Sequence, residues 1–238
     1  MKLPKPDIVI FDMDGTSVRH INPRLLHVME WMDDAYFKIS RFFLWLLRRH
    51  AKGPIIPDLK NYENRKKPKL VVHRVLHKVR RKSVEQIVEP CPGIYAVLNF
   101  LEKQGIPMAL VSNGLGKGYG HDILDKFDLE KFYRATIFRE DIKKSKPHPE
   151  PILLALQSMG ITVKDSDVIW YVGDRHKDIV AALAADKLIK AKIEPVAYGL
   201  HAALALIDKG LSPDNIIMSY YDMLDYLHVM LGTEGEAA

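Results

Sequence analysis

The sequence predicts an α/β fold in which a parallel sheet is flanked by helices and carries an inserted α-helical domain. Two observations support this prediction. First, from Gly93 onward, short apolar runs typical of buried strands alternate with amphipathic stretches typical of helices. Second, the segment between Ser17 and Glu89 has its own charge balance and only helical periodicity. A chain of 238 residues has room for one such core and a smaller insertion.

The first predicted strand, Ile8–Phe11, is a β-branched apolar run without a polar interruption. Such a run is typical of a central strand that is buried on both faces of a parallel sheet. It ends in Asp12 and Asp14, which Gly15 and Thr16 follow. Ligands of open α/β sheets bind outside the carboxyl ends of the strands, so both acids lie where a ligand is expected. The alternative is a strand that simply ends in a polar Asp-Gly turn.

Asp12 and Asp14 can divide the chemistry of a phosphoryl group between them. Side chains two residues apart on an extended chain project to the same face, so both carboxylates would meet one ligand. One carboxylate can attack phosphorus as a nucleophile, and the other can move a proton on and off the leaving group. A carboxylate at the mouth of a hydrophobic strand is costly unless it is compensated, and a divalent cation would compensate it.

The insertion is predicted to be a separate α-helical domain. One helical stretch runs from Asn22 to about His50, and a second runs from about Leu70 to Val88. Between Ser17 and Glu89, 17 lysines and arginines stand against 7 acids, a net charge of +10, whereas the whole chain carries +5. The predicted domains are therefore a core formed by 1–16 and 90–238 and a helical domain formed by 17–89.

From Gly93 onward, each predicted strand is followed by a helix, as a parallel sheet requires. The predicted strands are 107–111, 135–138, 168–172, 194–198 and 215–218, and the predicted helices are 94–104, 119–127, 149–159 and 176–185, with one more after each of the last two strands.

Two polar clusters lie next to these predicted elements. Ser112 and Asn113, in an S-N-G motif, come after the strand 107–111, and a hydroxyl with free backbone N–H groups can hold phosphate oxygens there. Lys146 comes just before a predicted helix, where an ammonium can offset the charge of a nucleophile and a transferring phosphoryl group. The alternatives are an ordinary turn for S-N-G and a solvated loop for the basic cluster around Lys146.

A further cluster, G-D-R-H-K-D at Gly173–Asp178, follows the predicted strand 168–172. Asp174 and Asp178 are four residues apart at a strand-to-helix turn and can converge on one cation. Hard oxygen ligands suit Mg²⁺, which binds through few carboxylates and keeps several waters. The alternative is that Asp174 only caps the helix that follows.

Taken together, the clusters resemble the four motifs of the haloacid dehalogenase (HAD) superfamily, in the same order. They are D-x-D-G-T at Asp12–Thr16, S-N at Ser112, K-P at Lys146 and G-D-x-x-x-D at Gly173–Asp178. The resemblance covers Ile8–Asp14 and the chain from Gly93 onward, and it implies a Rossmann-like sheet. The helical insertion directly after the first motif is similar to the C1-type cap of phosphoglycolate phosphatase-like members.

The resemblance also implies a role for each residue. Asp12 would be the nucleophile that forms an aspartyl-phosphate, and Asp14 would be the general acid and then the general base for the hydrolytic water. Ser112, Asn113 and Lys146 would bind the phosphoryl group, and Lys146 would also take part in catalysis. The family's dehalogenases lack an aspartate at the position of Asp14. The presence of Asp14 in this chain therefore favours phosphoryl chemistry over dehalogenation. Mg²⁺ would be held by Asp12, the backbone carbonyl of Asp14, Asp174 and, directly or through water, Asp178.

The expected function is therefore a Mg²⁺-dependent phosphatase that hydrolyses a small phosphorylated metabolite, a phosphomonoester. A phosphotransferase or phosphomutase of the same family is an alternative, in which a sugar hydroxyl takes the phosphoryl group instead of water. An alternative of a different class is a nucleic-acid-binding protein on a HAD core, because the basic segment 65–82 can track phosphates. The intact set of acids argues against this last alternative.

The predicted cap would draw phosphorylated anions to the site through its positive charge. Arg19, His20 and Arg24 come just after the first motif and are candidate substrate contacts, with solvated side chains as the alternative for each. The aromatic segment 39–50 is expected to pack inside the cap or against a second subunit of a homodimer, in preference to a membrane surface.

The remaining sequence signals concern the compartment. The single cysteine, Cys91, excludes an internal disulfide and fits a reducing compartment. Residues Met1–Pro6 lack the apolar region of a signal peptide, and the apolar run Phe42–Leu47 is too short to span a bilayer. We therefore expect a cytoplasmic protein whose partner is a small phosphorylated substrate and not nucleic acid or a membrane.

Overall fold

The computed structural model of the chain describes residues 3–21 and 87–232. Contacts divide the chain into two compact units, one formed by Met1–His20 and Val84–Ala238 and the other by Ile21–Ser83. Apart from Ile21, all described residues belong to the first unit. The predicted cap helices lie outside the described residues, except for Ile87 and Val88 at the end of the second helix. Arg24 also lies outside the described residues. The helical cap and its domain limits therefore stay predictions.

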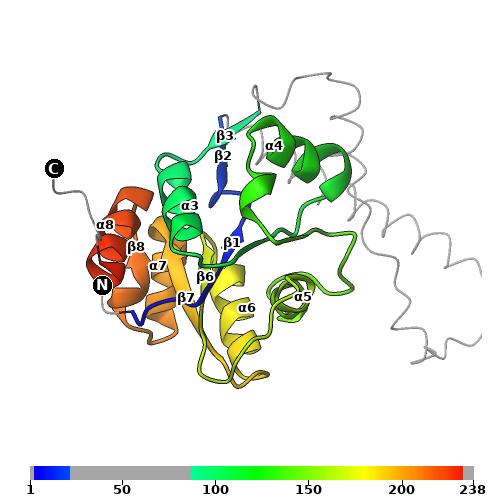
Figure 1. The fold of residues 1–238 in the computed structure, drawn as a ribbon. Coiled ribbons are helices and arrows are strands. Elements are labelled where there is room, and N and C mark those ends of the chain that lie inside the picture. Colours follow the sequence, from blue (N-terminus) through cyan, green and yellow to red (C-terminus); the bar gives the residue numbers. More distant parts are fainter. Residues whose placement is uncertain (1–2, 22–86, 233–238) are drawn as a thin grey trace, which may run out of the picture. The chain divides into compact units, whose positions relative to one another are not determined.

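A six-stranded sheet runs through the first unit, and all of its neighbouring strands are parallel (Figure 1). The strand order is β5-β4-β1-β6-β7-β8. The parallel α/β fold predicted from the alternation of strands and helices is confirmed. The strands are β1 (Ile8–Asp12), β4 (Met108–Val111), β5 (Ala135–Ile137), β6 (Val168–Gly173), β7 (Lys192–Tyr198) and β8 (Ile216–Ile217).

The first strand lies between β4 and β6, and all five of its residues are buried. Its side chains alternate between two apolar clusters, with Val9 and Phe11 in one and Ile8 and Ile10 in the other. The continuous apolar run is thus explained by burial on both faces of the sheet, as predicted. Asp12 is the exception in this strand, because a buried carboxylate needs a partner.

Helices cover both faces of the sheet (Figure 1). Buried apolar residues of α3, α4 and α8 pack in the cluster that contains Phe11, and those of α5 and α6 pack in the cluster that contains Ile10. Helix α7 packs against α6 on this second face. The helices are α3 (Ile94–Lys103), α4 (His121–Lys126), α5 (Glu150–Ser158), α6 (His176–Asp186), α7 (Gly199–Asp208) and α8 (Tyr220–Leu231).

None of these helices is both long and apolar enough to cross a membrane. Their bounds agree with the predicted helices to within a few residues, except around the predicted helix 119–127. There a wide helical turn, η3 (Gly116–Gly120), precedes the short helix α4. Lys117 and Gly118 leave the helical backbone conformation, and Gly118 has a φ of 75°, which glycine adopts without strain.

A two-stranded antiparallel ribbon lies beside the first motif and was not predicted. It pairs β2 (Val18–His20) with β3 (Val88–Pro90), and His20 lies opposite Val88. The prediction of a helix that continues through Val88 is therefore wrong at its end. Three-residue strands are too short to give a periodic signal in the sequence, and in the structure the pairing of the strands and the burial of Val18 and Val88 define them.

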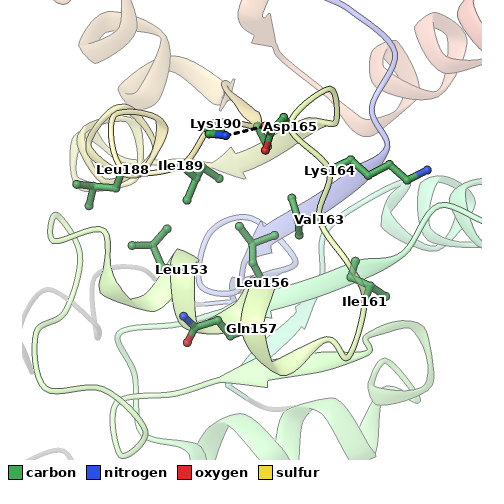
Figure 2. Close-up of a pocket in the computed structure, with 11 residues that line it drawn as sticks. Leu153, Leu156, Gln157, Ile161, Val163, Lys164, Asp165, Leu188, Ile189 and Lys190 are labelled. Atoms are coloured by element: carbon green, nitrogen blue, oxygen red, sulfur yellow. Dashed lines mark hydrogen bonds and ion pairs between the residues drawn. The ribbon is translucent and has the colours of Figure 1, made fainter.

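A cavity of about 440 Å³ lies at the opposite edge of the sheet from Asp12, between α5 and the loops that lead into β6 and β7 (Figure 2). Apolar side chains, among them Leu156 and Ile161, line most of it. The ion pair between Asp165 and Lys190, 3.0 Å long, belongs to the same lining. The polar side chains predicted from the motifs do not line this cavity.

The central position of β1 gives a test of stability. Replacing Ile10 by alanine leaves a cavity in a fully buried site, so we expect the free energy of unfolding to fall by about 2–5 kcal/mol. The matched control is Val229→Ala on α8, whose side chain is 85% exposed and whose loss is expected to change stability by less than about 0.5 kcal/mol. Urea unfolding measures both values. Equal losses in the two variants would contradict the assignment of β1 as the centre of the core.

Candidate active site

The carboxyl ends of the central strands bring the predicted polar residues to one edge of the sheet. Asp12 is the last residue of β1, Ser112 follows β4, and Asp174 follows β6. In the ladder, Asp12 lies opposite Val111 of β4, so the ends of these strands are level. Parallel pairing thus places side chains together that lie about a hundred residues apart in sequence.

Lys146 lies at the buried centre of this edge. Its Nζ contacts Oδ1 of Asp12, lies 2.8 Å from Oδ1 of Asp178, and donates a hydrogen bond to the carbonyl of Val111 at 3.3 Å. Burial alone would lower the pKa of Lys146, but the carboxylates of Asp12 and Asp178 raise it well above its usual value. The ammonium therefore stays charged, and it compensates the carboxylate that closes β1.

Asn113 holds the backbone of Lys146 in place. Its Oδ1 accepts a hydrogen bond from the Lys146 N–H, and its Nδ2 donates one to the Lys146 carbonyl, both at 3.0 Å. These two bonds fix the loop from which the Lys146 side chain reaches the interior. The Asn113 amide is thus a support for Lys146, and the phosphate contact predicted for Asn113 stays a prediction.

Asp12, Asp174 and Asp178 form a cluster in which one carboxylate oxygen from each lies within 4.8 Å of the others. The Oδ1 atom of Asp174 is buried and has no hydrogen-bond partner among the described residues. An unpaired buried carboxylate oxygen costs free energy, which a bound cation would recover. Both oxygens of Asp178 are already engaged, one by Lys146 and the other by the N–H of Arg175 at 3.1 Å. The donor set fits a divalent cation that favours oxygen ligands.

The electrostatics of this cluster point the same way. Burial raises the pKa of Asp12 from 3.8 to about 7, although Lys146 opposes the shift. Burial likewise raises the pKa of Asp174 from 3.8 to about 6, and the nearby charge of Asp178 adds to the effect. Burial thus disfavours the ionised forms of both carboxylates, and the neighbouring cations only partly offset this effect. A divalent cation would supply that charge and favour the ionised forms.

Gly15 permits the first motif to approach Asp174. Its φ is +88°, and a Cβ atom at this position would lie 2.2 Å from Oδ2 of Asp174. Gly173 is similarly close to Asp178, because a Cβ there would lie 2.4 Å from the Asp178 Cβ. Close packing of the acids therefore requires both glycines, and the positive φ of Gly15 also favours glycine there.

Asp14 lies next to the cluster, but its carboxylate has different partners. Its Oδ1 accepts a hydrogen bond from the Tyr119 hydroxyl at 2.7 Å, and its Oδ2 accepts one from Ser112 Oγ at 3.2 Å. Burial would raise the pKa of Asp14, but the nearby His20 side chain and the hydrogen bond from Tyr119 lower it below its usual value. The surroundings of the two acids of the first motif thus shift their pKa values in opposite directions, upward for Asp12 and downward for Asp14.

Arg19 and His20 follow the first motif on β2, and their side chains point in different directions. His20 reaches the site, with its Nε2 atom 3.1 Å from the Tyr119 hydroxyl and 3.8 Å from Oδ1 of Asp14. Arg19 does not, because neighbouring strand residues face opposite sides and its guanidinium pairs with Glu89 at 2.7 Å. The structure therefore places His20 among the acids and Arg19 away from them.

Sequence reasoning missed two side chains at this site. Tyr119 belongs to no motif and lies in a glycine-rich stretch, so only its burial and its contact with Asp14 reveal it. Ser17 donates a hydrogen bond from Oγ to the carbonyl of Asp12 at 2.8 Å and thereby fixes the turn after β1. A serine after D-G-T carries no signal of its own, because small polar residues are common in turns.

The arrangement suits the transfer of a phosphoryl group to a carboxylate. It offers one carboxylate beside a buried ammonium, a second carboxylate held by hydroxyl groups, and an acid cluster that fits a cation. Charge neutralisation around a nucleophile and positioning of a proton donor are the two requirements of this chemistry.

Comparison with known proteins agrees with this geometry. Residues 9–188 match the family described as haloacid dehalogenase-like hydrolase. The pyrophosphatase PpaX of Halalkalibacterium halodurans is 26% identical over 226 residues, which cover 93% of this chain and 96% of that enzyme. The phosphoglycolate phosphatase of Escherichia coli K12 is 30% identical over 158 residues, which cover 65% of this chain and 59% of that enzyme.

Solved structures show the same fold. A HAD-superfamily hydrolase from Ehrlichia chaffeensis superimposes with a TM-score of 0.60 at 20% identity, over 97% of this chain and all of that one. A predicted phosphoglycolate phosphatase from Haemophilus somnus gives a TM-score of 0.57 at 18% identity, over 94% of this chain and 99% of that one. The family match spans most of the chain, and it includes all four motifs of the candidate site. The chain therefore belongs to the haloacid dehalogenase-like hydrolase family and is an enzyme of the HAD type.

Proposed function

We propose that this hydrolase is a Mg²⁺-dependent phosphatase that releases phosphate from a small phosphorylated metabolite through an aspartyl-phosphate on Asp12. The observation that carries the proposal is the meeting of Asp12, Asp174 and Asp178 around Lys146 at one edge of the sheet. No structural requirement of the fold calls for three buried or half-buried acids and a lysine at this place. A transferring phosphoryl group calls for all of them.

In this proposal, an oxygen of Asp12 attacks phosphorus, and the bond from phosphorus to the leaving oxygen breaks. The ammonium of Lys146 stays against Asp12 throughout and offsets the negative charge that gathers on the transferring group. Ser112 Oγ, which donates to Oδ2 of Asp14 at 3.2 Å, would donate to a phosphoryl oxygen when the substrate binds. Attack by water on the phosphorus of the aspartyl-phosphate then releases inorganic phosphate and restores Asp12.

Asp14 handles the protons of both steps. It gives a proton to the oxygen of the leaving group in the first step and takes one from the attacking water in the second. Its position beside Asp12 and its hydrogen bonds to hydroxyl groups support this role. A lowered pKa suits the second step directly, because the ionised carboxylate is the base.

Mg²⁺ would be held by Asp12, Asp174 and the backbone carbonyl of Asp14, with Asp178 in support. When bound, it would supply positive charge to the phosphoryl oxygens and to Asp12. The orphaned Oδ1 atom of Asp174 supports a cation at this place. The contacts of Asp178 with Lys146 and with the Arg175 N–H support an indirect role for Asp178, through the position of its neighbours.

The relatives support a small substrate. One is named a pyrophosphatase and another a phosphoglycolate phosphatase, and both names denote hydrolysis of a small phosphorylated anion. We propose the same class for this chain, with the basic segment 17–89 as the part that attracts the anion. Transfer of the phosphoryl group to a sugar hydroxyl is the outcome that product analysis would distinguish.

The nucleophile gives the most direct test. Asp12→Asn keeps the shape of the side chain but removes the attacking oxygen anion, so hydrolysis of p-nitrophenyl phosphate should fall by at least about a thousandfold. The matched control is Asp165→Asn, whose exposed carboxylate pairs with Lys190 in the lining of the cavity at the opposite edge of the sheet and whose loss should leave the rate unchanged. A variant without Asp12 that keeps most of its activity would overturn the proposed mechanism, and a gel shift with RNA or DNA but no hydrolysis by the unaltered protein would favour nucleic-acid binding.

Cation binding gives a second test, read from thermal unfolding. The raised pKa values of Asp12 and Asp174 mean that the cation-free folded protein binds more protons than the unfolded chain between about pH 4 and pH 7, so its stability falls as the pH rises through this window. A cation binds the ionised forms and competes with these protons. One fixed Mg²⁺ concentration, about a hundredfold above the Kd at pH 7.5, should be used at both pH values. It should raise Tm by roughly 5–10 °C at about pH 7.5 and by clearly less at about pH 5.5.

Asp174→Asn should abolish this rise in Tm, because it removes the charge from the carboxylate with the unpaired oxygen. Chelation with EDTA should return the unaltered protein to its lower Tm and stop hydrolysis. A rise in Tm that is equal at both pH values, or one that survives in Asp174→Asn, would show that Mg²⁺ binds elsewhere.

A further inference from the structure

The hydrogen bonds around Asp14 form a chain that crosses three segments. The Tyr119 hydroxyl lies 2.7 Å from Oδ1 of Asp14 and 3.1 Å from Nε2 of His20. The rings of His20 and Tyr119 lie almost parallel, with 13° between their planes. Neither residue belongs to the four motifs, yet both are held against the acid to which the proton chemistry is assigned.

The number of hydrogens gives this chain a direction. A phenol carries one proton, and an ionised carboxylate can only accept, so the Tyr119 proton goes to Asp14 Oδ1. The Tyr119 oxygen then accepts from His20, and this assigns a hydrogen to His20 Nε2. Burial raises the pKa of Tyr119 well above its usual value, so the phenol keeps its proton. The two hydrogen bonds therefore run in one direction, from His20 to Tyr119 and from Tyr119 to Oδ1 of Asp14.

This direction decides which oxygen of Asp14 is available to carry a catalytic proton. Oδ1 keeps the hydrogen bond from the Tyr119 hydroxyl. Oδ2 accepts from Ser112 Oγ, and this oxygen becomes available for an added proton when Ser112 donates to the bound phosphoryl group instead. Oδ2 is the oxygen that faces Ser112 Oγ, 3.2 Å away, on the side where the phosphoryl group is proposed to bind. A half turn of the carboxylate would exchange the two oxygens, and the bond from Tyr119 opposes that turn.

The segment that carries Tyr119 is itself fixed. The carboxylate of Glu140 accepts hydrogen bonds from the N–H groups of Gly116 and Lys117, at 2.9 and 3.3 Å. Gly120 packs so closely on Phe138 that a Cβ atom there would lie 2.2 Å from the ring. The Tyr119 hydroxyl therefore projects toward Asp14 from a turn whose backbone is fixed by hydrogen bonds and packing, and the fold sets its orientation.

We propose that Tyr119 and His20 are positioning residues that hold the Asp14 carboxylate with Oδ2 toward the leaving group and direct the catalytic proton to that oxygen. This inference rests on the proposed role of Asp14 as the general acid. It adds two residues to the machinery, one from the η3 turn and one from the end of β2. The competing explanation is that both side chains only fill space and satisfy buried polar atoms.

Leaving groups distinguish the two explanations. The p-nitrophenolate ion departs without a proton, whereas the alkoxide of an alkyl phosphate needs one as it leaves. Tyr119→Phe should therefore lower kcat/KM for an alkyl phosphate by about 10- to 100-fold, and lower kcat/KM for p-nitrophenyl phosphate by less than about threefold. Equal losses on both substrates, or no loss on either, would overturn the proposal. The matched control is Tyr226→Phe, whose hydroxyl donates to the carbonyl of Leu3 at 2.8 Å and whose loss should change neither rate.

His20 gives a second pair of variants, which keeps the proposal testable if Tyr119→Phe does not fold. His20→Gln retains an N–H donor near the position of Nε2, and His20→Leu does not. We expect the glutamine variant to keep most of the alkyl phosphatase activity. The leucine variant should lose about three- to tenfold on the alkyl phosphate alone. Equal activities of the two variants, or an equal loss on both substrates, would contradict a donor at this position.

A measurement without turnover separates this inference from the proposed function. The Tyr119 hydroxyl proton, buried between two partners, should give a slowly exchanging NMR resonance with a cross-peak to the His20 ring, and Tyr119→Phe should remove it. Hydrolysis without this resonance in the unaltered protein would overturn the donor chain. The resonance without any hydrolysis would instead overturn the proposed phosphatase function.

Discussion

The contact of Lys146 with Asp12 and Asp178 is the interaction on which the site depends. β1 is a fully buried apolar strand, and it ends in a carboxylate that burial alone would protonate. The ammonium of Lys146 makes an anion at that place tolerable, and Asp178 keeps the ammonium charged in turn. Removal of one member of such a buried set leaves an uncompensated charge, which costs several kcal/mol. The three residues are therefore a unit, although they come from three distant segments.

Most of the sheet could be predicted from the sequence, because its strands are apolar runs that periodicity and turn residues delimit. The position of Asp12 at a strand end was also predictable, since a carboxylate directly after such a run has few structural uses. The site followed from the motifs and from the rule that parallel strands present their carboxyl ends at one edge. These inferences depend on local pattern and on topology, and both are legible in a single sequence.

Contacts that depend on three-dimensional packing were not predictable. Tyr119 reaches Asp14 from a turn in which Lys117 and Gly118 leave the helical conformation and Gly120 packs closely on Phe138, and no spacing in the sequence indicates that turn. The β2–β3 ribbon was not predicted, because strands of three residues are too short to show a periodic pattern of apolar residues in the sequence. Arg19 and His20 are adjacent in sequence, and both were candidate substrate contacts, yet strand alternation places only His20 beside the acids.

The ribbon also defines the junction through which the insertion is connected. His20 and Val88 are partners across the ladder, so the chain departs for residues 21–87 and returns at neighbouring points. Two paired strand residues are about 5 Å apart, which is the span of a hairpin connection. At this junction the chain can therefore accept segments of very different length and sequence without any change in the catalytic sheet. Such a junction separates variation in the connecting segment from the strands that carry the acids.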